Sequence, residues 1–268
     1  MSDEIILQRS AQAQKQQVFP TEVIDLPSKG IFYPPGSPLS NGRVELKLMT
    51  AKEEDILTSP NLLKKGLAID KLLESLIVDK NIKLTDLLLG DKNAIIFAVR
   101  RLAYGDNYGP VEVPCSKCAA KNVVNIDLSA LKEKELDETQ YEPGVNLFEY
   151  TLPLSKVTIK LKLLTDGDEK LIDKDNQAYS KLNKVGSTEL TSRLKKMIVE
   201  FNGESDPVKI RPLVDNMRSQ DSFALRQYVR SITPDIDANF DFTCSECGAM
   251  ERGAVPMTVT FFWPDTRV

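Results

Sequence analysis

The chain has 268 residues, of which 41% are hydrophobic and 28% are charged, and its formal net charge is −4 at pH 7. These values are typical of a globular protein with a substantial core, and they exclude a general electrostatic attraction to nucleic acid or anionic membranes. Because the chain contains no histidine, Ser-His-Asp and Cys-His nucleophile pairs, imidazole acid–base groups and imidazole-bound zinc are also excluded.

Two segments of distinct composition come first. Residues 1–20 carry an Ala/Gln-rich run without an apolar stripe, which predicts a mobile tail or a helix that becomes ordered on a partner. Residues 21–43 contain four prolines around Ile31, Phe32 and Tyr33. Prolines at this density exclude a helix and favour an extended arm. Since an extended segment can lie along another chain, these three residues are the first candidate for a partner surface.

Residues 44–131 are predicted to form a first half of mixed strand and helix. Val44–Leu48 alternates like a half-buried strand, and Thr50 with Glu53 forms a capping box that starts a helix. Later elements follow from apolar spacing. Their positions are Ile69, Leu72, Leu73, Leu76 and Ile77 in one helix, Ile95, Ala98, Val99 and Leu102 in the next, and Val124, Ile126 and Leu128 in a strand after a Cys-x-x-Cys pair.

A charged linker at residues 132–149 leads to a second half, residues 150–268, where the same kinds of element recur in the same order. Thr165 begins the segment that supplies the corresponding helix start. The apolar positions are Val157, Ile159, Leu161 and Leu163 in a strand, Leu190, Leu194, Met197, Ile198 and Phe201 in a helix, Leu225, Tyr228, Val229 and Ile232 in another, and Val259, Phe261 and Trp263 in a last strand. The predicted fold class is α+β, with two related halves of strand, helices, cysteine turn and strand.

The cysteines form two pairs, Cys115 with Cys118 and Cys244 with Cys247. Two thiolates in one tight turn can hold a tetrahedral metal, and two such turns complete the four-sulfur arrangement of structural zinc. No apolar run is long enough to span a membrane, and the first residues lack the apolar core of a signal peptide. We therefore expect a cytosolic protein with reduced cysteines, in which Zn²⁺ joins the two halves.

Three other uses of these cysteines stay open: structural disulfides, a thioredoxin-like redox pair and an iron–sulfur cluster. The redox pair would require a helix to start at the first cysteine, whereas the following residues favour strands. Gly248 suits the left-handed turn of a metal knuckle. We expect Lys117, Lys121 and Arg252, together with the backbone amides of the turns, to compensate the net charge of −2 on a zinc ion with four thiolates.

Further basic and aromatic residues favour ordinary structural roles. The pairs Arg100-Arg101 and Lys195-Lys196 are predicted to lie on solvated helix faces. The terminal Phe261-Phe262-Trp263-Pro264 is predicted to be a core strand, with an exposed partner anchor as the alternative. No phosphate-binding glycine loop or calcium loop is present, so the sequence offers no catalytic residue.

An ordered set of motifs resembles one protein family. Its members are Leu26–Pro34, Leu48–Leu57, Asp86–Ala94, Tyr104–Tyr108, the two cysteine pairs and the terminal Phe-Phe-Trp-Pro, across residues 21–264. This combination resembles the baseplate hub assembly proteins of T4-like contractile-tailed bacteriophages. The resemblance implies a non-enzymatic role in the hub or in its assembly, other baseplate and tail proteins as partners, no small-molecule substrate, and a place in the host cytoplasm during assembly or in the virion baseplate.

Two other functional classes are compatible with paired cysteines. A nucleic-acid-binding zinc-ribbon protein would bind DNA or RNA in a salt-dependent way, but no basic stripe with interleaved aromatic residues supports it. A cytosolic thiol oxidoreductase would need a strongly lowered cysteine pKa and a disulfide substrate. Among these hypotheses, the baseplate role has the most support.

Overall fold

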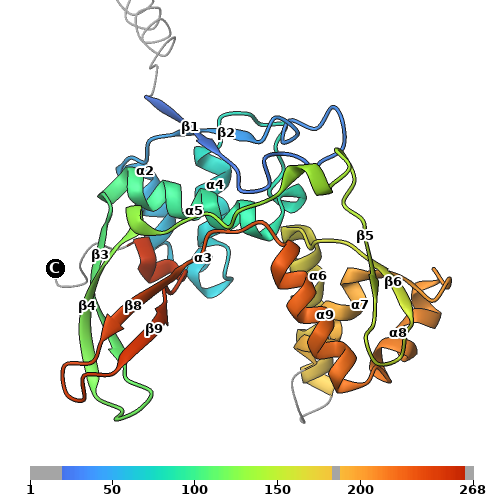
Figure 1. The fold of residues 1–268 in the computed structure, drawn as a ribbon. Coiled ribbons are helices and arrows are strands. Elements are labelled where there is room, and N and C mark those ends of the chain that lie inside the picture. Colours follow the sequence, from blue (N-terminus) through green and yellow to red (C-terminus); the bar gives the residue numbers. More distant parts are fainter. Residues whose placement is uncertain (1–19, 183–187, 263–268) are drawn as a thin grey trace, which may run out of the picture.

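A computed structural model describes residues 20–182 and 188–262 as a mixture of helices and small antiparallel sheets (Figure 1). The helices are α2 (Ala51–Thr58), α3 (Pro60–Lys64), α4 (Ala68–Leu76), α5 (Leu89–Tyr104), α6 (Asp166–Leu182), α7 (Glu189–Met197), α8 (Pro207–Asp215) and α9 (Ser219–Ile232). The strands are β1 (Thr21–Asp25), β2 (Arg43–Lys47), β3 (Asn107–Pro114), β4 (Lys121–Asp127), β5 (Phe148–Thr151), β6 (Thr158–Leu161), β7 (Ile198–Phe201), β8 (Asn239–Thr243) and β9 (Met250–Ala254).

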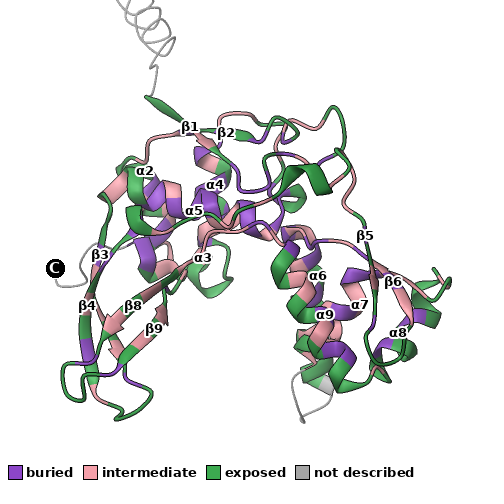
Figure 2. Cartoon of the chain, viewed as in Figure 1, coloured by how far each residue is buried: buried purple, intermediate pink, exposed green. Residues whose placement is uncertain are grey.

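The elements form two groups and a pair of hairpins. Figure 1 shows β1, β2 and α2–α5 in one group, and β5, β6 and α6–α9 in the other, where β7 pairs with β6. After α9 the chain returns to the first group, where the hairpin β8–β9 lies beside the hairpin β3–β4. Figure 2 shows that buried residues concentrate in α4, α5 and parts of α6–α9, whereas the two hairpins are mostly exposed or half-buried. None of the helices described is both long and apolar enough to cross a membrane.

Local sequence signals predict several elements correctly. The predicted first strand corresponds to β2, and α2 begins at the predicted capping box. There the Glu53 carboxylate accepts hydrogen bonds from the backbone N–H and the hydroxyl of Thr50, at 3.0 and 2.5 Å. The helices predicted from the stripes of apolar residues around Leu72, Ile95 and Leu225 are α4, α5 and α9.

Two predicted elements in the second half are wrong. The apolar stripe from Leu190 to Phe201 is not one helix, because α7 ends at Met197 and the next four residues form β7, which pairs with β6. The predicted last strand is a 3-10 helix over Val259–Phe262. Phe261 is fully buried, and its ring packs against Phe97 at 5.2 Å between centroids. Trp263, the third residue of that predicted strand, lies outside the described residues.

The proline-rich segment is not an exposed arm. After β1, residues 26–42 follow a series of turns, and the side chains of Phe32 and Tyr33 are only 3% and 5% exposed. The Tyr33 hydroxyl donates to the Asp91 carboxylate at 2.6 Å and accepts a hydrogen bond from the backbone N–H of Leu88 at 2.9 Å. The prediction that Ile31, Phe32 and Tyr33 form a partner surface is therefore wrong, because the aromatic pair belongs to the core.

A buried ionic cluster joins the two groups of helices. Lys92 on α5 contacts both Asp70 on α4, at 2.6 Å, and Asp166 at the start of α6. Lys170, one turn further along α6, contacts both carboxylates at 2.7 Å. Burial raises the pKa of Asp70, but the ammonium groups of Lys170 and Lys92 more than offset this, so its pKa lies below the ordinary value. The two groups are thus connected independently of the cysteines.

Candidate metal centre

The two hairpins present the cysteines in matching turns. In the first, the Cys115 N–H donates to the Ala120 carbonyl at 2.9 Å; in the second, the Cys244 N–H donates to the Ala249 carbonyl at the same distance. The residue after each second cysteine has a positive φ, 58° at Ala119 and 68° at Gly248. Glycine adopts this conformation freely and alanine at some cost, so the first turn is the more strained one.

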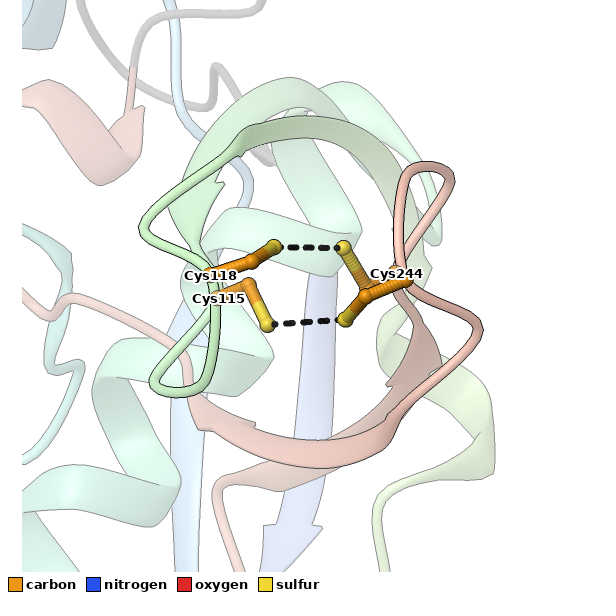
Figure 3. Close-up of side chains that lie close together, drawn as sticks. Cys115, Cys118 and Cys244 are labelled. Carbon is orange, nitrogen blue, oxygen red and sulfur yellow. Dashed lines mark hydrogen bonds between the residues drawn. The ribbon is translucent and has the colours of Figure 1, made fainter.

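The four sulfur atoms lie within 4.8 Å of one another. Across the interface, Cys115 Sγ is 3.7 Å from Cys247 Sγ, and Cys118 Sγ is 3.6 Å from Cys244 Sγ (Figure 3). A zinc ion with four sulfurs at about 2.3 Å requires sulfur–sulfur separations of about 3.8 Å, whereas a disulfide requires about 2.05 Å. The four thiols are unpaired, and their spacing fits a tetrahedral metal site.

Apolar packing between the tips of the hairpins is slight. The apolar cluster at this site contains only Cys115, Cys244 and Ala249, with Ala120 against it, and it is separate from the main core. Such a small cluster contributes little burial energy, while a structural zinc ion can contribute on the order of 10 kcal/mol. The donor set and its surroundings therefore suit a metal that has a structural role.

The thiols differ in acidity although they lie close together. The backbone N–H of Cys247 is the main group that lowers the pKa of the Cys244 thiol, to about 6. For Cys118, the N–H of Ala120 lowers the pKa, but the neighbouring sulfurs and burial outweigh it and the pKa is about 12. One thiolate is therefore stabilised by amides and by its neighbours' S–H groups, and a metal must displace the remaining protons.

Each hairpin also holds the turn of the other through a polar side chain. Asn122 on β4 accepts hydrogen bonds from the backbone N–H and the hydroxyl of Ser245, at 2.9 and 3.2 Å. Glu251 on β9 accepts the hydroxyl of Ser116 through both carboxylate oxygens, at 2.8 Å. These two positions are 129 residues apart, the same spacing as Cys115 and Cys244. Sequence reasoning missed both side chains, although this shared spacing could have found them.

The basic residues expected around the sulfurs mostly lie elsewhere. Lys121 forms an ion pair with Glu112 at 3.1 Å, and Arg252 pairs with Asp237. Lys117 contacts the site through its backbone N–H, which is 3.4 Å from Cys115 Sγ. The expected turn amides therefore lie next to the sulfurs, whereas Lys121 and Arg252 form their ion pairs with carboxylates.

The redox alternative lacks its structural requirement. Both cysteine pairs lie in hairpin turns between antiparallel strands, and no helix begins at Cys115 or Cys244 among the residues that the structure describes. A helix N-terminus is the feature that stabilises the attacking thiolate in thioredoxin-like proteins. The two hairpin turns thus suit a site that holds four sulfurs together.

Comparison with known protein families gives a match over most of the chain. Residues 23–263 match the model of the family described as T4 bacteriophage base plate protein. No curated protein and no solved structure matches the chain.

Proposed function

Because the chain belongs to the T4 bacteriophage base plate protein family, we propose that it is a non-enzymatic component of the baseplate hub or of its assembly. The observation that carries this proposal is the extent of the match, which covers residues 23–263 and therefore both cysteine pairs. The protein would act through contacts with other baseplate and tail proteins, in the host cytoplasm during assembly or in the tail of the virion.

We propose further that Zn²⁺ is held by Cys115, Cys118, Cys244 and Cys247 and that its role is structural. The sulfur separations and the small apolar cluster at the tips of the hairpins support this assignment. When bound, the ion would supply the crosslink between the hairpins β3–β4 and β8–β9. Four protein thiolates fill its coordination sphere, so no position would be left for a substrate.

The chain is best divided into two related halves, residues 44–131 and 150–268, with the linker 132–149 between them. Beyond the hairpins, a second pair of matching contacts supports this. The Asp91 carboxylate on α5 accepts the Ser28 N–H at 3.0 Å, and the Asp221 carboxylate on α9 accepts the Ser155 N–H at 3.1 Å. Each serine precedes a lysine with a positive φ, 52° at Lys29, before the first half, and 61° at Lys156 in the second.

Residues 21–43, which precede the first half, are not an extended arm throughout. Residues 26–42 pack on the first half, so within residues 21–43 only β1 and Arg43, the first residue of β2, are extended. We propose that residues 1–20, the predicted tail, are the part of this region that contacts neighbouring proteins.

Inactivating the gene for this chain in its phage tests the proposal. We expect infected cells to accumulate no complete baseplates, and a plasmid copy of the wild-type gene to restore them. Mass spectrometry of purified virions then distinguishes a hub component, which is present, from an assembly factor, which is absent. Normal tails in electron micrographs of the inactivated phage would contradict the proposal.

A further inference from the structure

A recess of about 310 Å³ lies between the linker and the last turn of α9. Its walls come from two parts of the chain, residues 140–149 and the α9 residues Tyr228 and Ile232. The lining combines aromatic and aliphatic side chains, such as Tyr141 and Tyr228, with the carboxylates of Glu142 and Glu149. It is therefore a surface where apolar faces and negative charge are close together.

The charged groups of this recess have no ion partners within the described residues. Glu142 and Glu149 are both exposed, and neither forms an ion pair there. Lys160 lies opposite Glu149 on the neighbouring strand, but its ammonium group binds Glu200 at 2.9 Å and interacts with Glu149 only at longer range. A second recess, lined by α5, differs in this respect: its acidic Asp25 is already neutralised by Arg43.

The aromatic groups are also left with unused polar atoms. In the described parts of the chain, the hydroxyls of Tyr141 and Tyr228 form no hydrogen bond, although both rings are half-buried. Burial raises the pKa of each of these tyrosines, so both hydroxyls stay protonated at neutral pH and can donate as well as accept.

The rings are held in place before any ligand arrives. Tyr228 stacks on Tyr150 with a centroid separation of 4.4 Å and an interplanar angle of 15°. Tyr141 packs edge-on against Phe32 at 5.1 Å. The linker is fixed to the segment 26–42 by a hydrogen bond from the Gly144 N–H to the Ile31 carbonyl at 2.6 Å. Because the walls are preformed, binding costs little ordering of the protein.

We propose that this recess receives an arginine side chain from a partner protein. A guanidinium is planar and weakly hydrated, so it can lie against tyrosine rings while its N–H groups reach carboxylates. Glu142 and Glu149 supply the negative charge, and the two tyrosine hydroxyls supply further acceptors. That the partner is a protein rests on the proposed baseplate role; the preference for a guanidinium rests on the recess alone.

A titration with N-acetyl-arginine methylamide, followed by NMR on the isotope-labelled full chain, tests the preference. We expect saturable shift changes at residues 140–149 and 228–232. The citrulline analogue, which has the same shape without the charge, should bind at least about tenfold more weakly. Shift changes that do not saturate, that spread over all acidic surfaces or that are equal for citrulline would overturn the inference.

The double variant Glu142→Gln/Glu149→Gln should lose at least about tenfold in affinity for the arginine probe, since both changes keep size and remove charge. Glu22→Gln, on the exposed strand β1, is the matched control and should bind like the wild type. An unchanged affinity in the double variant would also overturn the inference. If the probe binds as expected but the chain never associates with baseplate proteins, the proposed function fails and the recess assignment stands.

Discussion

Two adjacent arginines on α5 should differ sharply in their importance for stability. Arg100 is 1% exposed and donates to three carbonyl oxygens, those of Phe261 at 2.8 Å and of Gly105 and Asn107 at 3.2 Å. Arg101 is exposed and pairs with Asp106 at 2.5 Å on the surface. The expectation that both face solvent is wrong for Arg100, which ties the C-terminal 3-10 helix to the base of the hairpin β3–β4.

The expected loss of stability on replacing Arg100 follows from these contacts. A hydrogen bond from a charged donor contributes about 1.5–3 kcal/mol. The burial cost of a guanidinium without a carboxylate partner offsets part of this sum, and burial accordingly lowers the pKa of Arg100. The exposed carbonyls of Gly105 and Asn107 can regain water, but that of the fully buried Phe261 cannot. Arg100→Met should therefore lower the free energy of unfolding by about 3 kcal/mol.

Urea unfolding followed by far-ultraviolet circular dichroism measures this difference. With a slope of about 2–3 kcal/mol/M, Arg100→Met should lower the midpoint by at least about 1 M urea. Arg101→Met is the matched control and should change the free energy of unfolding by less than about 1 kcal/mol, as for exposed ion pairs. Equal, small changes in both variants would refute the assigned role of Arg100.

Three further predictions concern the hairpins, the ionic cluster and the first segment. Asn122→Ala should release zinc to a chelator at least about tenfold faster than the wild type, because it loses the hydrogen bonds to the opposite turn. Asn125 is exposed on the same strand, so the control Asn125→Ala should release zinc at the wild-type rate. Asp70→Asn should be less stable than the wild type at pH 7, but the difference in stability should shrink below about pH 4. A carboxylate whose pKa is lowered in the folded state loses its contribution to stability as the pH falls. A constant difference in urea unfolding at pH 7 and 3.5 would count against this. Deleting residues 1–19 should leave the thermal unfolding midpoint unchanged. Deleting residues 1–38 should prevent folding, because Phe32 and Tyr33 are core residues. A cooperative thermal transition in the longer deletion would contradict this.

The sequence predicted those features that depend on neighbours along the chain. The capping box at Thr50 and the apolar stripe of α4 require contacts within one or two helical turns, so spacing alone indicates them. The clustering of the four cysteines was also predictable, because each turn carries its own Cys-x-x-Cys motif and a shared metal would bind both.

The features that the sequence predicted wrongly depend on partners far away in the sequence. Tyr33 is buried because its hydroxyl binds Asp91, 58 positions later, and no local pattern distinguishes this from an exposed proline-rich arm. Ile198 continues the helical spacing of α7, yet pairing with Leu161 on β6 turns the chain into a strand. Arg100 follows the sequence pattern of a solvated residue, but its acceptor on Phe261 is 161 positions away.

Elemental analysis of the full chain, purified without chelators, tests the central account most directly. The account predicts about one zinc per chain, and none in the Cys118→Ser/Cys247→Ser variant, whose α-helical circular dichroism should persist because the Lys92 cluster holds the two groups of helices together. Wild-type protein that contains no metal, carries four free thiols and still shows hydrogen-exchange protection in both hairpins would contradict it.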